Sequence, residues 1–203
     1  MWALIEDSAI TKIINNPRGM VIDDIQYSRK IFSLWSVSEK EAKGIYEVVF
    51  NNTNKKDEEY YTNTNQSFAF ADGVVTASFG SATAKAHADA NATDADGNDL
   101  DPVVVIPGLK TKKIEIVKAQ AATILQDTDW YIVRKADADT DVPSAITTYR
   151  AAVRTKAAAM ETLITNASNT PAIETLYTYV NTADEGDPVV MERSLGVFPV
   201  LGS

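Results

Sequence analysis

Short apolar runs separated by turn residues dominate the first part of the chain, and this pattern predicts an antiparallel β-rich region over residues 1–80. Its clearest part is SFAFA followed by VVTAS, with Asp72 and Gly73 between them. Because Asp-Gly tolerates the positive φ angles of a two-residue turn, we expect a hairpin here. The expected register forms apolar cross-strand pairs on one face, which should lie on a core: Phe70 with Val75 and Phe68 with Ala77.

A second hairpin is predicted in MVIDDIQY, with Asp23 and Asp24 at its turn. Between the two hairpins lies VSEKEAKGIYEVVF, which predicts a short helix followed by a strand. Ser38 and Glu41 have the spacing of a capping box, and Gly44 is a typical stop signal.

Residues 81–108 have a different composition. The stretch AKAHADANATDADGNDLDP is rich in Ala, Asp and Asn and has no apolar period, which indicates an acidic linker or an exposed loop. The run VVVIP follows Pro102 and is the one extended apolar piece of this segment. We expect it to return the chain to the sheet.

A helical period begins near Lys110 and predicts a three-helix region over residues 109–182. The second helix, from about Ser144, should be the longest, and Thr170 with Pro171 should cap and open the third. Residues 183–203 contain several Gly and Pro and are predicted as an extended tail. The expected fold class is therefore α+β, with a small N-terminal antiparallel β domain and a C-terminal helical hairpin or three-helix region.

The composition narrows the possible functions. The net charge of -9 and the absence of a dense basic run argue against nucleic-acid binding. There is no cysteine, so disulfides and thiolate chemistry are excluded. No segment has the roughly 20 apolar residues that a membrane span needs, and the first residues do not resemble a signal peptide. We therefore expect a soluble chain made in a cytoplasm, without a membrane partner.

Candidate metal and cofactor sites are weak. The acidic loop DADGNDLD resembles a calcium loop, but with Gly97 at the obligatory sixth position the first and twelfth positions are Ala92 and Val103. A solvated loop is the better interpretation. His87 is the only histidine and has no partners for a histidine metal site. No nucleotide-binding motif occurs, so we expect no cofactor.

Candidate catalytic groups are equally weak. A hydrolase triad would have to use His87, but no nucleophile elbow occurs and a surface histidine is the simpler hypothesis. Paired carboxylates are frequent, yet glycosidase chemistry needs one carboxyl in an apolar environment. Among the groups Asp127/Asp129, Asp137/Asp139/Asp141 and Asp184/Glu185/Asp187, only Asp129, next to Trp130, has an aromatic neighbour in the sequence. The sequence therefore predicts a protein that is not an enzyme.

The segment TDWYIVR connects the first two predicted helices. The connection of about fifteen residues fits an ordered crossing segment better than a minimal loop. We expect Trp130 to cover the ends of both helices, with the ring of Tyr149 at their interface. Arg150 and Arg154 lie on one helix face, where they could pair with an acid of the connection, Asp127 or Asp129.

This region also resembles a known family. Leu125 followed by TDW, and then YRAAVR from Tyr149, is similar to the "L..(T/S)DW … YR..LR" signature of bacteriophage tail and tail-fibre assembly chaperones. The resemblance covers roughly residues 110–160. Two positions depart from the signature: Val153 replaces the usual Leu, and the Trp expected before the Tyr-Arg pair is absent.

The chain as a whole, through MWALIEDSAITKIINNP, IFSLWSVSEKEAKGIYEV and NTPAIETLYTYVNT, is similar to uncharacterised proteins encoded among the tail genes of marine tailed phages such as cyanophages. The resemblance implies non-catalytic binding of tail or tail-fibre subunits in the host cytoplasm during assembly. Two further hypotheses stay open: a permanent virion component (fibre, baseplate or neck), and an acid-base hydrolase of host polysaccharide that would depend on Asp129. A homo-oligomer is also open. The residues expected to bind a partner or to stabilise the hairpin are Asp129, Trp130, Tyr149, Arg150 and Arg154.

Overall fold

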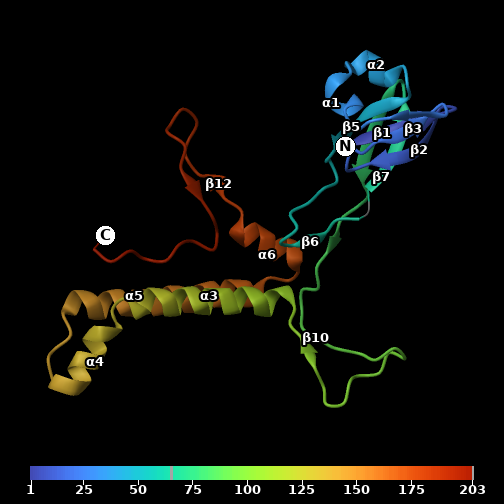
Figure 1. Ribbon diagram of the computed structural model, residues 1–203. Helices are drawn as coiled ribbons and strands as arrows, with labels where there is room; N and C mark the ends of the chain where they lie inside the picture. Colours follow the sequence, from blue (N-terminus) through green and yellow to red (C-terminus); the bar gives the residue numbers. More distant parts are fainter. Residues whose placement is uncertain (65, 203) are drawn as a thin grey trace. The chain divides into compact units, whose positions relative to one another are not determined.

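A computed structural model describes residues 1–64 and 66–202 and has an α+β fold, which confirms the predicted fold class (Figure 1). The chain divides into two compact units, Met1–Thr83 and Ala84–Ser203. The first unit holds the main β-sheet, and the long helices belong to the second.

The first unit is built on a five-stranded sheet with the order β2-β1-β5-β8-β7. The outer strands β2 and β7 also approach each other, so the sheet curls towards closure. One pair, β5 with β8, is parallel, whereas the sequence predicted antiparallel strands throughout. The chain forms β7 first, as the outer strand, and then turns back. The next strand, β8, therefore lies between β7 and β5 and runs in the same direction as β5. The strands are β1 (Trp2–Glu6), β2 (Ala9–Ile14), β5 (Ile45–Asn51), β7 (Gln66–Ala71) and β8 (Val74–Phe79).

Both predicted hairpins are confirmed. The turn between β7 and β8 has positive φ at Asp72 (52°) and Gly73 (76°), and the predicted pairs form: Phe70 with Val75 and Phe68 with Ala77. The ribbon of β3 (Met20–Ile22) and β4 (Ile25–Tyr27) turns at Asp23 and Asp24, again with positive φ. Two-residue turns of this kind match the right-handed twist of the flanking strands.

The strand β1 is buried on both faces. Its Ala3 lies in the interior of the curled sheet, in a cluster with Val48, Val75 and Ala77. Leu4 points to the opposite face and packs in a second cluster with Ile22, Ile31 and Ile45, under the β3–β4 ribbon and α1 (Ile31–Leu34). A strand covered on both sides can bury apolar residues on both faces, which explains the apolar run from Trp2 to Ile5.

The short helix α2 (Val37–Glu41) begins two residues earlier than predicted. Its capping box uses Ser36 and Glu39: the Ser36 hydroxyl accepts from the Glu39 amide at 3.2 Å, and the Glu39 carboxylate accepts from the Ser36 amide at 2.7 Å. The prediction of Ser38 and Glu41 is therefore wrong. SVSEKE contains the motif twice. Packing selects the first copy, because Trp35, just before the cap, packs edge-on against Tyr27 with ring centroids 5.2 Å apart.

The second unit contains a long helical hairpin of α3 (Leu109–Gln126) and α5 (Ser144–Asn166), which lie side by side (Figure 1). The predicted apolar stripes form its interface, where Val117, Val153 and Met160 are almost fully buried. The helix α6 (Thr170–Tyr177) follows, with Pro171 in its first turn as predicted. Its cap is Asn169 rather than Thr170, because the Asn169 side chain reaches the Ala172 amide at 2.9 Å.

The connection between α3 and α5 contains a further helix, α4 (Asp129–Ala138), which the sequence pattern did not predict. No residue of α4 is buried. Its large apolar residues form one short continuous run, WYIV, and such a run does not distinguish a helix from a strand. The helix ends at Ala138, and the next residue, Asp139, has a left-handed φ of 49°. The Lys135 ammonium pairs with the carboxylates of Asp139 and Asp141 just beyond, at 2.7 and 2.9 Å.

The segment expected to be a linker or loop contains a short antiparallel ribbon of β10 (Ala90–Asn91) and β11 (Val105–Ile106). The VVVIP run therefore pairs locally, and the expectation that it returns to the main sheet is wrong. A similar ribbon, β12 (Val180–Asn181) with β13 (Met191–Glu192), includes the first part of the predicted tail, residues 183–203. Beyond it, the Leu195 amide donates a hydrogen bond to the Leu176 carbonyl. The remaining strands are β6 (Tyr61–Thr62) and β9 (Thr83–Ala84).

Candidate functional site

The predicted site residues gather at the end of the helical hairpin where α3 stops and α4 starts. Arg150 of α5 reaches this junction and is only 6% exposed. Its Nη1 donates to the Leu125 carbonyl at 2.7 Å and to the Thr128 hydroxyl at 2.6 Å. Its Nη2 lies 2.8 Å from an Asp129 carboxylate oxygen. The expected ion pair between Arg150 and the connection is thus present, and the partner is Asp129 rather than Asp127.

These contacts satisfy helix ends as well as side chains. The last carbonyls of α3 carry partial negative charge, and a guanidinium beside the Leu125 carbonyl complements it. Asp129 stands in the first turn of α4, where a carboxylate complements the positive end of a helix. Thr128 is 2% exposed and donates its hydroxyl proton to the Leu125 carbonyl at 2.9 Å. Arg150 therefore fixes the angle at which α4 leaves the hairpin.

Contrary to the prediction, Trp130 does not cover the helix ends. It is 51% exposed and lies in the first turn of α4, where its ring stacks on Tyr131 with centroids 4.1 Å apart. The guanidinium of Arg134, one turn further on, lies 4.8 Å from the centre of the Trp130 ring. Ile132 and Val133 are also exposed. The helix thus presents an apolar surface that nothing in its own unit buries, among the described residues.

Tyr149 and Arg154 stand apart from the Arg150 junction. Tyr149 is half-buried and lines a hollow of about 450 Å³ between the start of α5 and residues 199–202 of the tail. Arg154 is exposed, and no ion pair forms on it within the described part of the chain. Of the five predicted residues, the structure joins Asp129 to Arg150 and leaves Trp130, Tyr149 and Arg154 on the surrounding surface.

Sequence reasoning missed a second polar cluster, at the start of α3. The Asp89 carboxylate accepts from the Gly108 amide at 2.8 Å, and hydrogen bonds from Thr111 and Gly108 lower the pKa of Asp89. A Cβ on Gly108 would meet the Ala88 backbone at 2.3 Å, so the two segments touch directly. His87 is half-buried beside this contact, not a free surface histidine. No local pattern links residues this far apart in the chain.

The acidic loop that follows β10 is held by local hydrogen bonds of Asp94. In the predicted calcium-like loop, the Asp94 carboxylate accepts from the amides of Asp96 and Asn98, both at 2.9 Å, and the Asn98 bond is the main reason for its lowered pKa. Within residues 1–64 and 66–202, no group of His, Asp and Glu side chains is arranged to hold a metal ion. The same residues include no helix long and apolar enough to cross a membrane.

Comparisons of this chain with protein-family models, with curated proteins and with solved structures give no match. The geometry of the site is therefore the basis for a functional hypothesis. It consists of a buried arginine junction that holds a short helix and an apolar helix surface that remains exposed.

Proposed function

We propose that this chain is a non-enzymatic bacteriophage tail-associated protein that binds tail or tail-fibre subunits during virion assembly in the host cytoplasm. The observation that carries this proposal is the exposed apolar surface of α4, formed by Trp130, Ile132 and Val133. Large apolar side chains exposed together on one element are typical of protein-binding surfaces. Tryptophan in particular is enriched among the residues that dominate binding energy.

In this proposal, Asp129 and Arg150 have a structural role and Trp130 has a binding role. Asp129 and Arg150 hold α4 at the end of the hairpin through their 2.8 Å contact. Trp130, between them in the motif, faces solvent and is free to enter a pocket of the partner. A rigid, preorganised helix loses little conformational entropy when it binds, which favours affinity.

The test is co-purification. The tagged full-length chain is produced together with the tail and tail-fibre subunits of the phage that encodes it, and the bound subunits are identified by mass spectrometry. Substitution Val133→Asp places a charge in the centre of the α4 surface without touching a buried residue. We expect it to remove the bound subunit, because burying an unpaired charge in an apolar interface is unfavourable.

Val21→Asp is the matched control, since Val21 is also an exposed valine (55%) but lies on β3 of the first unit. It should retain the subunit. Retention by both variants, or loss by both, would contradict a role for α4. A wild-type chain that retains no tail or fibre subunit would contradict the proposed function itself.

A permanent place in the virion is the second candidate function. It is favoured by a further group of exposed apolar residues between α6 and the end of the chain, which a stable assembly could cover: Val180, Val189, Val190, Met191, Val197 and Val200. Mass spectrometry of purified particles separates the two candidates. A transient assembly factor should be absent from mature virions, whereas a structural component should be present in stoichiometric amounts.

A further inference from the structure

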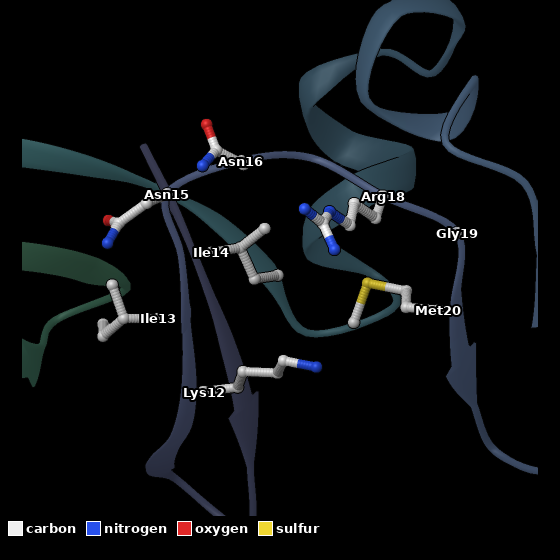
Figure 2. A pocket seen from close by; sticks show the side chains of 8 residues that line it. All are labelled: Lys12, Ile13, Ile14, Asn15, Asn16, Arg18, Gly19 and Met20. Atoms are coloured by element: carbon white, nitrogen blue, oxygen red, sulfur yellow. The ribbon is translucent and has the colours of Figure 1, made fainter.

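The first unit contains a small hollow at the end of its sheet that has no role in the proposed binding of tail subunits by α4. It lies between β2, the loop that follows it and the start of β3, and has a volume of about 270 Å³. Figure 2 shows the side chains of Lys12 and Arg18 on opposite sides of this hollow, with Ile14 and Met20 between them. The Ile14 side chain is buried, so the floor is apolar and firm.

The charge of this hollow differs from that of the protein. The chain has a net charge of -9, yet the lining residues include two cations and no carboxylate. Neither Lys12 nor Arg18 forms an ion pair within the described residues. The nearby acids of the β3–β4 ribbon are at its far end, and Asp23 there is paired with Lys43 at 3.0 Å.

The walls of the hollow are held in place. β2 is paired along its length with β1, with Lys12 opposite Leu4 and Ile14 opposite Trp2. The other wall is the start of β3, where the Gln26 side-chain amide donates to the Tyr27 carbonyl at 3.1 Å and to the Met20 carbonyl at 3.5 Å. Lys12 therefore extends from a paired strand, and Arg18 lies in the loop two residues before Met20, whose carbonyl is held. A held backbone lowers the entropy cost of binding at this end of the sheet.

We propose that this hollow binds a phosphate group. A guanidinium can donate two parallel hydrogen bonds to one face of a phosphate, and the ammonium of Lys12 can approach a third oxygen from the other side. The volume limits the ligand to a small one, because a water molecule occupies roughly 30 Å³ in the liquid and typical ligand pockets begin at about 300 Å³. The apolar floor would suit a short carbon stem on the phosphate.

A neighbouring hollow extends the cationic character of this end of the sheet. Asn16 lines both hollows, and the second is formed by Arg29 together with the rings of Trp2 and Phe32. Arg29 likewise has no ion pair in the described part of the chain. A phosphate carried by a larger molecule could therefore place its carrier over the loop between the two hollows.

The experiment is a titration of the full-length protein with inorganic phosphate and with phenyl phosphate, followed by the ¹H–¹⁵N NMR signals of Arg18 and Gly19. Sodium chloride of equal ionic strength is the reference, since simple screening produces no saturable change. We expect saturable shifts. Tighter binding of phenyl phosphate would assign the site to a phosphate monoester, and equal binding would assign it to free phosphate.

The double variant Lys12→Gln with Arg18→Gln should bind phosphate and phenyl phosphate at least about tenfold more weakly. Each hydrogen bond to a charged group contributes a factor of about ten or more to the affinity. Both side chains are exposed, so folding should be unaffected. Arg18→Lys keeps the charge but not the bidentate geometry, and should bind with intermediate affinity. The control Lys110→Gln with Lys112→Gln changes the charge equally in the second unit. No saturable binding, or equal weakening in the control, would overturn the proposal.

Discussion

The guanidinium of Arg150 and the carboxylate of Asp129 meet at 2.8 Å although they belong to different helices, and Arg150 is almost completely buried at this contact. The same guanidinium holds the Leu125 carbonyl at the end of α3. One side chain thus closes one helix, opens the next and connects both to a third. The occurrence of TDW and YRAAVR in the same chain acquires a structural explanation from this relationship.

Replacing Arg150 with Met should reduce the free energy of unfolding of the second unit by about 2–3 kcal/mol. The Thr128 hydroxyl and the Leu125 carbonyl would lose a charged donor while remaining partly buried. Arg154→Met is the control, because Arg154 is exposed on the same helix and should change the free energy by no more than about 0.5 kcal/mol. Urea unfolding followed by circular dichroism measures both. Equal effects would contradict the role given to Arg150.

The capping box of α2 can be tested with two serines two residues apart. Ser36→Ala should destabilise the first unit by about 1 kcal/mol, because the Glu39 amide loses its acceptor. Ser38→Ala should be neutral or slightly stabilising, since Ser38 lies inside the helix, where alanine is preferred. Thermal unfolding of the two variants distinguishes them. A larger loss for Ser38→Ala would restore the capping box that the sequence pattern predicted.

Gly108 permits the close contact between the start of α3 and residue 88. Gly108→Ala should lower the free energy of unfolding by about 2 kcal/mol or more, because the added Cβ would lie 2.3 Å from backbone atoms that cannot move independently. Gly80→Ala is the comparison. Its Cβ would meet the Thr64 hydroxyl at 2.7 Å, and that side chain can rotate away at a cost of about 1 kcal/mol or less. Similar losses in denaturant unfolding would argue against a rigid contact at Gly108.

The Asp89 carboxylate should make stability depend on pH in the acid range. Hydrogen bonds from Thr111 and from the Gly108 amide lower its pKa in the folded protein. Its contribution is therefore fully present above its unfolded pKa and is lost as the pH falls through the folded pKa. Asp89→Asn should flatten the fall in unfolding free energy below about pH 4. Thr111→Val should flatten it in part, and an unchanged acid slope in both variants would contradict the assignment.

The sequence alone determined the features that depend on neighbouring residues. Asp72 with Gly73 and Asp23 with Asp24 adopt positive φ, so both hairpins and the register of Phe70 with Val75 could be predicted. The stripes of α3 and α5 were visible for the same reason, since helix-facing positions repeat along the chain. The candidate residues Asp129 and Arg150 were found from their spacing relative to the predicted helices.

The tertiary structure decided what depends on contacts between distant residues. It selected Ser36 over Ser38 as a cap through the packing of Trp35, and it placed β8 parallel to β5. It also formed α4, whose short apolar run WYIV is compatible with a strand as well as a helix, and it left Trp130 exposed instead of over the helix ends. Local patterns record which face of an element is apolar. Which partner covers that face, or whether any does, follows only when the chain is folded.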